Sequence, residues 1–157
     1  MKFFKANEVA QAAVEIERKG QAFYRNVAKA AQSDAARELF TFMAGEESKH
    51  EVVFQALKDR LGDIEMPAYS NADEYQDYLE ALIESHALFN GGVAEKLAAE
   101  ASDLKSAVDI ALAFEKDTLL FFMEMKELVP DSEKPLVQQC IEEERSHMRM
   151  LRGLLKA

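Results

Sequence analysis

The chain has 157 residues, of which 48% are apolar and 31% charged, a composition typical of one folded domain spanning residues 1–157. Its net charge of −10 argues against a nucleic-acid or anionic-membrane partner, because either needs a basic surface. The only cysteine, Cys140, excludes an intrachain disulfide and a Cys-x-x-Cys metal site. The sequence has no signal peptide and no apolar run of about 18 residues, so we expect a reducing, cytoplasmic location and no membrane span.

Apolar residues recur along the chain at a spacing of about 3.6, which predicts an all-α fold. Capping residues, glycine and proline divide this pattern into four long helices. The predicted helices run from Asn7, taken as an N-cap, to Ala31; from Ser33-Asp34 to Gly62; from Ser102-Asp103 to just before Pro130; and from the Ser132–Pro135 segment nearly to the chain end.

Short loops join the first helix to the second and the third to the fourth, which predicts two antiparallel hairpins packed as a four-helix bundle. About forty residues separate the hairpins, more than a crossover along the bundle requires. The surplus is amphipathic until Gly91-Gly92, so we expect one or two extra short helices there. Its apolar face is expected to carry Tyr75, Tyr78, Leu79, Leu82, His86 and Phe89.

Each predicted helix has a seam of apolar or small residues with one glutamate near its middle. On two helices a histidine follows that glutamate three residues later, which places both side chains on one helical face. The inward polar residues are Glu17, Glu47, His50, Glu115, Glu144 and His147.

The pattern repeats within the chain. Glu17 and Glu115 are 98 residues apart, and the two Glu-x-x-His pairs are offset by 97. The segment "EIERKGQAFY" (15–24) also matches "AFEKDTLLFF" (113–122) at the inward positions. The two hairpins therefore resemble two copies of one unit, whose polar residues should face each other across a pseudo-twofold axis.

Four carboxylates in an apolar core cannot all stay ionised without partners, because a buried isolated charge costs many kcal/mol. Either they keep protons or cations occupy the site, and two divalent cations would balance four carboxylates. Oxygen and nitrogen ligands without a thiolate favour iron or manganese over a structural zinc site. We expect two iron ions, because such a pair stores two electrons; manganese or zinc could fill the site in a purified sample.

Other residues near this cluster have simpler interpretations. Tyr24 is either a core residue or a hydrogen-bonding neighbour of the cluster, since a buried phenol needs a partner and Glu17 lies two turns away. His86 is interpreted as a packing residue, and Cys140 as core filling. Glu142 and Glu143 face away from the seam, either in solvent or behind the ligands.

One glutamate on each of two helices, with Glu-x-x-His on the other two, resembles the ferritin-like di-iron superfamily, and within it the rubrerythrin family. The resemblance rests on Glu17 with Tyr24, "EESKH" (46–50), Glu115 and "EEERSH" (142–147). It implies a di-iron centre that reduces hydrogen peroxide, with Tyr24 hydrogen-bonded to a carboxylate. The implied ligands are Glu47 and Glu144 as bridges, Glu17 and Glu115 as terminal ligands, and His50 and His147 on one iron each.

The chain departs from the family pattern in three places. It has no Cys-x-x-Cys pairs, so we expect an external electron donor, a rubredoxin-like protein or a flavoprotein. Phe122 stands at the repeat position of Tyr24, and Thr118 stands where rubrerythrins carry a further glutamate. Thr118 and its repeat partner Gly20 are small, so we expect an open edge of the site with room for H2O2 or O2.

Three functions are compatible with the sequence. The first is a di-iron peroxidase or oxidase, a homodimer whose hairpins are in some cases exchanged between subunits. The second is an iron-storage protein with ferroxidase activity, against which the short segment after His147 argues. The third is a metal-free interaction bundle, which leaves the six inward polar residues unexplained.

Overall fold

The computed structural model describes residues 5–66, 72–87, 98–99 and 103–156. These residues contain no β-strand beyond an isolated bridge between Lys5 and Glu65, which confirms the predicted all-α class. No described helix has the length and apolarity needed to cross a bilayer. Ser102, Phe89 and Gly91-Gly92, named above, lie outside the described ranges. The long helices are α1 (Ala6–Ala30), α2 (Asp34–Leu61), α5 (Leu104–Leu128) and α6 (Lys134–Leu154), and a shorter helix is α3 (Ala72–Glu84).

Three of the predicted helix ends have the expected capping interactions. The Ser33 side chain accepts a hydrogen bond from the Ala36 backbone N–H at 3.2 Å, and the Asp103 carboxylate accepts one from Ser106 at 2.7 Å. Gly62 ends α2 with a φ of 49°, in the left-handed region that favours glycine. Local sequence therefore determines these boundaries.

The start of α1 differs from the prediction, because Lys5 and not Asn7 is the N-cap. The Lys5 backbone N–H donates to Glu8 Oε2 at 3.0 Å, and the Ala6 N–H donates to the Ile64 carbonyl at 2.9 Å. These bonds satisfy two of the N–H groups that the start of a helix leaves without an intrahelical partner. The helix thus starts earlier because the segment after α2 caps it, a tertiary contact that the local sequence does not encode.

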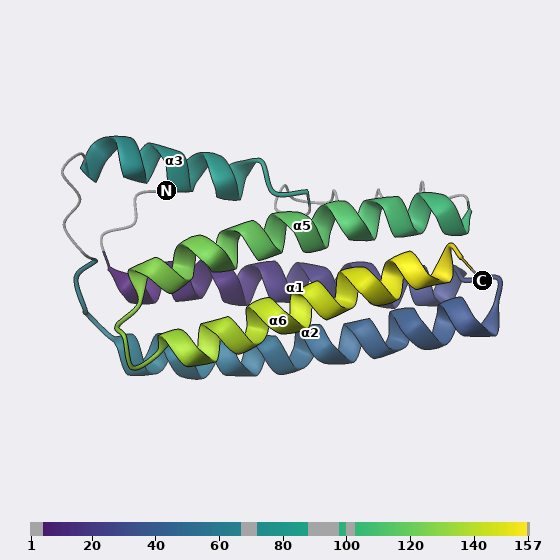
Figure 1. The fold of residues 1–157 in the computed structure, drawn as a ribbon, viewed down its shortest axis with the longest axis horizontal. Helices are drawn as coiled ribbons and strands as arrows, with labels where there is room; N and C mark the ends of the chain where they lie inside the picture. The colour runs from purple at the N-terminus through teal and green to yellow at the C-terminus, as the bar shows by residue number, and fades with distance from the viewer. Residues whose placement is uncertain (1–4, 67–71, 88–97, 100–102, 157) are drawn as a thin grey trace.

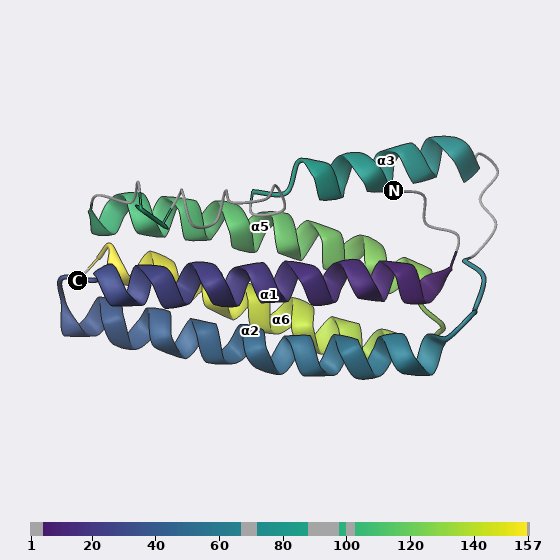
Figure 2. The ribbon, with the colours of Figure 1, turned by 180° about the vertical axis from the view of Figure 1, so that it is seen from behind.

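The four long helices form a bundle in which α1 packs against α2 and α5, and α6 packs against α5 and α2 (Figure 1). Neighbouring helices run antiparallel, and the chain crosses the length of the bundle between α2 and α5 (Figures 1 and 2). The two predicted hairpins are therefore the halves of the bundle. This arrangement points the apolar seams of all four helices at one central axis.

The helix α3 lies outside the bundle along α5, which confirms an extra helix in the crossover (Figure 2). Leu79 is buried, whereas the hydroxyls of Tyr75 and Tyr78 donate to opposite oxygens of Glu124 on α5, at 2.9 and 3.0 Å. These contacts hold α3 on the outer face of α5.

A glycine on α1 permits a close approach of Phe114, on α5, to the α1 backbone. A Cβ at Gly20 would lie 2.5 Å from Cζ of Phe114 and 2.9 Å from Oε2 of Glu47. Phe114 is fully buried and packs edge-on against Tyr24, with ring centroids 6.0 Å apart. The Phe114 ring therefore occupies the space that a side chain at position 20 would need.

Replacing this glycine tests the close approach. Gly20→Ala is expected to lower the free energy of unfolding by about 1–3 kcal/mol, because the new methyl group overlaps the Phe114 ring. Gly45→Ala is the matched control: Gly45 is helical and exposed, a Cβ there would meet nothing within 4 Å, and alanine should add up to about 1 kcal/mol. Urea unfolding measures both changes. Equal effects of the two substitutions would contradict the packing described.

Candidate metal centre

The six inward polar residues of the seams meet at the middle of the bundle. Each long helix contributes one carboxylate, and α2 and α6 each add an imidazole one turn later. The four glutamates are 0% exposed, and the two histidines are almost as deeply buried. The structure thus brings together Glu17, Glu47, His50, Glu115, Glu144 and His147.

These residues form two overlapping groups of four, in each of which the candidate ligand atoms lie within 4.8 Å of one another. Glu47 and Glu144 belong to both groups. The first group adds Glu17 and His50, and the second adds Glu115 and His147. Two glutamates are therefore shared between the groups, and each group has one glutamate and one histidine of its own. The roles of bridging and terminal ligands, which the family resemblance implies, stay a prediction.

The first group is built around Nδ1 of His50. This atom lies 2.8 Å from Oε1 of Glu144 and 3.7 Å from Oε2 of Glu17, yet it makes no hydrogen bond with any residue that the structure describes. In the second group Nδ1 of His147 lies 3.0 Å from Oε2 of Glu144 and 3.7 Å from Oε2 of Glu115. Both imidazoles therefore present Nδ1 to the carboxylates.

Seven buried atoms of this cluster have no hydrogen-bond partner among the described residues. Buried polar atoms in folded proteins are nearly always paired, so such a concentration at one point requires an explanation. A cation accepts lone pairs from carboxylate oxygens and from a neutral imidazole at once, and this donor set suits iron. The atoms are both oxygens of Glu17, both oxygens of Glu47, Nδ1 of His50, Oε2 of Glu115 and Oε1 of Glu144.

Without a cation, protons must neutralise the site. Burial raises the pKa of Glu17 and of Glu47 well above the usual range, and neighbouring carboxylates add to the shift for Glu47. Burial and the charge of Glu144 raise the pKa of Glu115 to about 8. Burial alone would raise the pKa of Glu144 too, but the neighbouring Glu115, His147 and His50 outweigh burial and hold this pKa below its usual value. One glutamate thus stays ionised while its neighbours keep protons.

The histidines take up protons in the same metal-free state. Burial lowers the pKa of His50, but Glu144 outweighs this effect and raises it to about 11. For His147 the effect of burial is outweighed by Glu115 and Glu144, and the pKa rises to about 10. Cations would therefore displace several protons from this site.

Tyr24 reaches the cluster from α1. Its hydroxyl donates a hydrogen bond to Oε1 of Glu115, on α5, and not to Glu17. Burial and the Glu115 carboxylate raise the pKa of Tyr24 well above its usual value, so the phenol stays protonated. The expected bond to a carboxylate is confirmed, and its partner is on the neighbouring helix.

The two glutamates beside Glu144 differ in their surroundings. Glu143 accepts a hydrogen bond from Nε2 of His50 at 2.6 Å, so it lies directly behind a candidate ligand. Glu142 is exposed and pairs with Arg145 at 2.6 Å. The repeat-related glutamate on α2, Glu46, pairs with Lys49 and makes no hydrogen bond to a histidine among the described residues. The outer surroundings of the two imidazoles are therefore not symmetric.

The predicted open edge at Gly20 is wrong, because the Phe114 ring fills it. At Thr118 the hydroxyl lies 3.0 Å from Nε2 of His86, a residue of the crossover that the sequence placed only in packing. His86 is buried against Phe114, with ring centroids 5.4 Å apart, and burial lowers its pKa to about 4. A phenylalanine and a neutral histidine thus cover this side. No local spacing links His86 to Thr118, which lies 32 residues later.

The comparisons with known proteins agree with this geometry. The family model described as Rubrerythrin matches residues 8–155, nearly the whole chain. The chain belongs to the rubrerythrin family. No curated protein matches it by sequence.

A solved structure from Thermotoga maritima, described as a candidate ferritin-like diiron-carboxylate protein, superposes on this chain with a TM-score of 0.74. The match covers 98% of this chain and 96% of that one at 22% identity. At that identity the likeness shows the fold, which is ferritin-like.

The raised pKa values give the metal-free protein a specific pH dependence. A carboxyl whose folded pKa is raised stabilises the fold below its unfolded pKa of 4.5 and loses that contribution as pH rises through the folded value, about 8 for Glu115. The pKa values of the two histidines are also raised, so their contribution to stability is likewise lost as pH rises, up to about pH 10 to 11. The melting temperature of metal-free protein should therefore fall between about pH 5 and pH 9.

Ferrous iron should reverse this trend by displacing the protons. Calorimetry in buffers of different ionisation enthalpy should show proton release on binding, and thermal scans should show that iron stabilises more at high pH. A flat or rising melting temperature without metal, or binding without proton release, would count against the buried cluster.

Proposed function

We propose that this protein is a non-haem di-iron enzyme that defends against oxidative stress. It reduces hydrogen peroxide and also O2, with little discrimination between the two oxidants. The observation that carries the proposal is the set of unpartnered carboxylate and imidazole atoms in two overlapping groups of four. Membership in the rubrerythrin family supports it.

The proposed ligands divide the six residues between two iron positions. Glu17 with His50 would hold one iron and Glu115 with His147 the other, while Glu47 and Glu144 would bridge them. Two ferrous ions, when bound, supply the two electrons that convert one H2O2 and two protons into two waters.

The remaining side chains position the ligands and exclude water. The hydroxyl of Tyr24 fixes the orientation of the Glu115 carboxylate, and Glu143 holds the His50 ring so that Nδ1 faces inward. Phe40 stacks on the Tyr24 ring, with centroids 6.3 Å apart, and Phe114 closes the side next to Gly20. This aromatic wall keeps bulk water away from the carboxylates, so only a small oxidant can approach.

Turnover needs electrons from outside the residues described. We propose an external rubredoxin-like or flavoprotein donor in a reducing, cytoplasmic compartment. A homodimer, with or without exchanged hairpins, stays a prediction.

The preference between oxidants tests the enzyme proposal. Thr118 stands where rubrerythrins carry a further glutamate, so the reduced wild type should react with both peroxide and oxygen. Thr118→Glu should raise the ratio of the peroxide rate to the oxygen rate by at least about tenfold, equivalent to about 1.4 kcal/mol between the barriers. Stopped-flow oxidation of the reduced, iron-loaded protein measures both rates.

Thr118→Val is the matched control for this experiment. It removes the hydroxyl that contacts His86 but adds no carboxylate, so the ratio should stay near the wild-type value. A wild type that already prefers peroxide by orders of magnitude, together with an unchanged ratio in Thr118→Glu, would contradict the proposed basis of oxidant choice. Failure of the reduced protein to react with either oxidant would contradict the enzyme proposal itself.

A further inference from the structure

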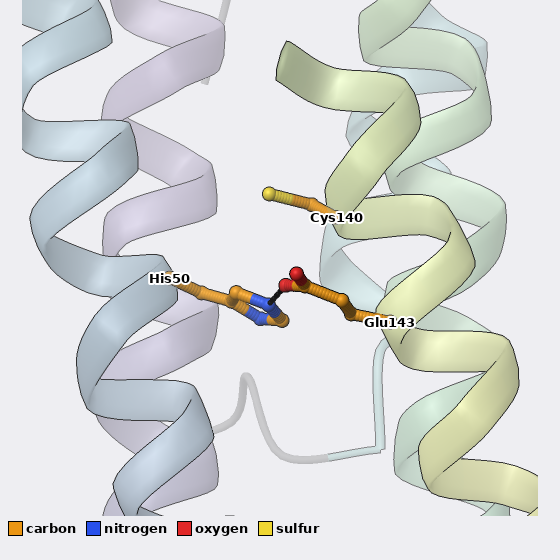
Figure 3. Close-up of side chains that lie close together, drawn as sticks. All are labelled: His50, Cys140 and Glu143. Carbon is orange, nitrogen blue, oxygen red and sulfur yellow. Dashed lines mark hydrogen bonds and ion pairs between the residues drawn. The ribbon is translucent and has the colours of Figure 1, made fainter. Parts of the chain in front are cut away.

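The outer face of His50 carries donor atoms that are not among the proposed di-iron ligands, although one of them, Glu143, also holds the His50 ring. Figure 3 shows His50 reaching from α2 towards α6, where Cys140 and Glu143 lie three residues apart on the same side of the helix. One candidate ligand atom from each of the three residues lies within 4.8 Å of the other two. The group combines a sulfur, a nitrogen and an oxygen donor.

Cys140 is buried in this position without a partner. It is 3% exposed, and the structure records no hydrogen bond to its thiol among the described residues. Glu143 is different, because its side chain is 38% exposed and connects the group to solvent. A cation could therefore reach the thiol from the surface along Glu143 without passing through the inner cluster.

We propose that Cys140, Glu143 and Nε2 of His50 form a third, outer metal position for a borderline or soft divalent cation such as Zn2+ or Cd2+. A thiolate with an imidazole and a carboxylate is a donor set that zinc accepts, with water in the fourth position. Zinc bond lengths of about 2.3 Å to sulfur and about 2.0 Å to nitrogen place those two atoms about 3.5 Å apart. The sulfur therefore needs to approach Nε2 by at most about 1.3 Å. Oε2 of Glu143, now 2.6 Å from Nε2, would move away to make room for the cation.

Binding at this position has a defined proton balance. The Cys140 thiol loses its proton to become a thiolate, and Nε2 of His50 loses the proton that it now shares with Glu143 at 2.6 Å. His50 then joins the outer cation through Nε2 while Nδ1 continues to face the inner carboxylates. Each outer cation thus releases two protons and makes His50 a bridge between the centres.

The internal repeat predicts that this position occurs once and not twice. The repeat counterpart of Cys140 on α2 is Met43, whose thioether carries no charge, and the counterpart of Glu143 is Glu46. Glu46 is already paired with Lys49. His147 therefore lacks an equivalent outer ligand set, and the chain should bind three soft cations in total.

Cadmium titration of the full-length metal-free protein tests this inference. Native mass spectrometry counts the bound cations, and the ultraviolet thiolate-to-cadmium charge-transfer band reports the sulfur ligand. The wild type is expected to bind three Cd2+ per chain with the band present. Cys140→Ala is expected to bind two without the band, and Cys140→Ser, which keeps a polar atom of similar size, should also lack it.

Met43→Leu is the matched control, because it changes the repeat-related sulfur on α2 and should leave three cations and the band intact. A wild type that binds two Cd2+ without the band would overturn the inference, as would a third cation retained in Cys140→Ala. Glu144→Ala tests the inner site separately, because this variant should lose an inner cation but keep the thiolate band. In the wild type, two bound cations without the thiolate band reject the outer position, whereas the band without any inner cation rejects the di-iron proposal.

Discussion

The burial of four carboxylates at one point on the bundle axis is the constraint on which the rest of this structure depends. Each is fully shielded from water, and removing one carboxylate from water without a counter-charge costs several kcal/mol. Protons can meet that cost in the metal-free protein, as the raised pKa values of Glu17, Glu47 and Glu115 indicate. Divalent cations meet it better, because they also satisfy the lone pairs that protons leave unpartnered.

The helical architecture follows from the same constraint. Antiparallel hairpins place the midpoints of all four helices at one level, so one glutamate per helix is enough to build the cluster (Figure 1). The backbone contributes no ligand, which is why long uninterrupted helices suit the task. Gly20 lets α1 approach Phe114 closely, and the crossover adds His86 as a cover over Thr118. The wall of the site is therefore built from both the bundle and its connection.

The internal repeat makes the inner site nearly symmetric. Departures from the repeat give the ligands of the two halves different hydrogen-bond partners. Tyr24 binds Glu115, whereas its repeat position holds Phe122, which cannot donate to Glu17. Glu143 supports His50, whereas Glu46 pairs with Lys49. A carboxylate behind an imidazole raises its basicity as a ligand, so the two proposed metal positions are not equivalent.

The sequence could predict what depends on helical periodicity, and could not predict what depends on contacts between distant segments. Glu47 and His50 fall on one face because of their spacing, so their inward position follows from the sequence alone. The bond from Tyr24 to Glu115 spans 91 residues, and the contact of His86 with Thr118 depends on where the crossover docks. The earlier start of α1 likewise depends on a backbone bond to Ile64.

The central claim is that the buried glutamates hold metal, and iron content is its most direct measure. Protein purified without added metal and then reconstituted with ferrous iron should contain two irons per chain. Glu144→Ala should lose at least one, whereas Glu142→Ala, an exposed neighbour on the same helix, should keep both. Two irons bound to Glu144→Ala as tightly as to the wild type would contradict the account.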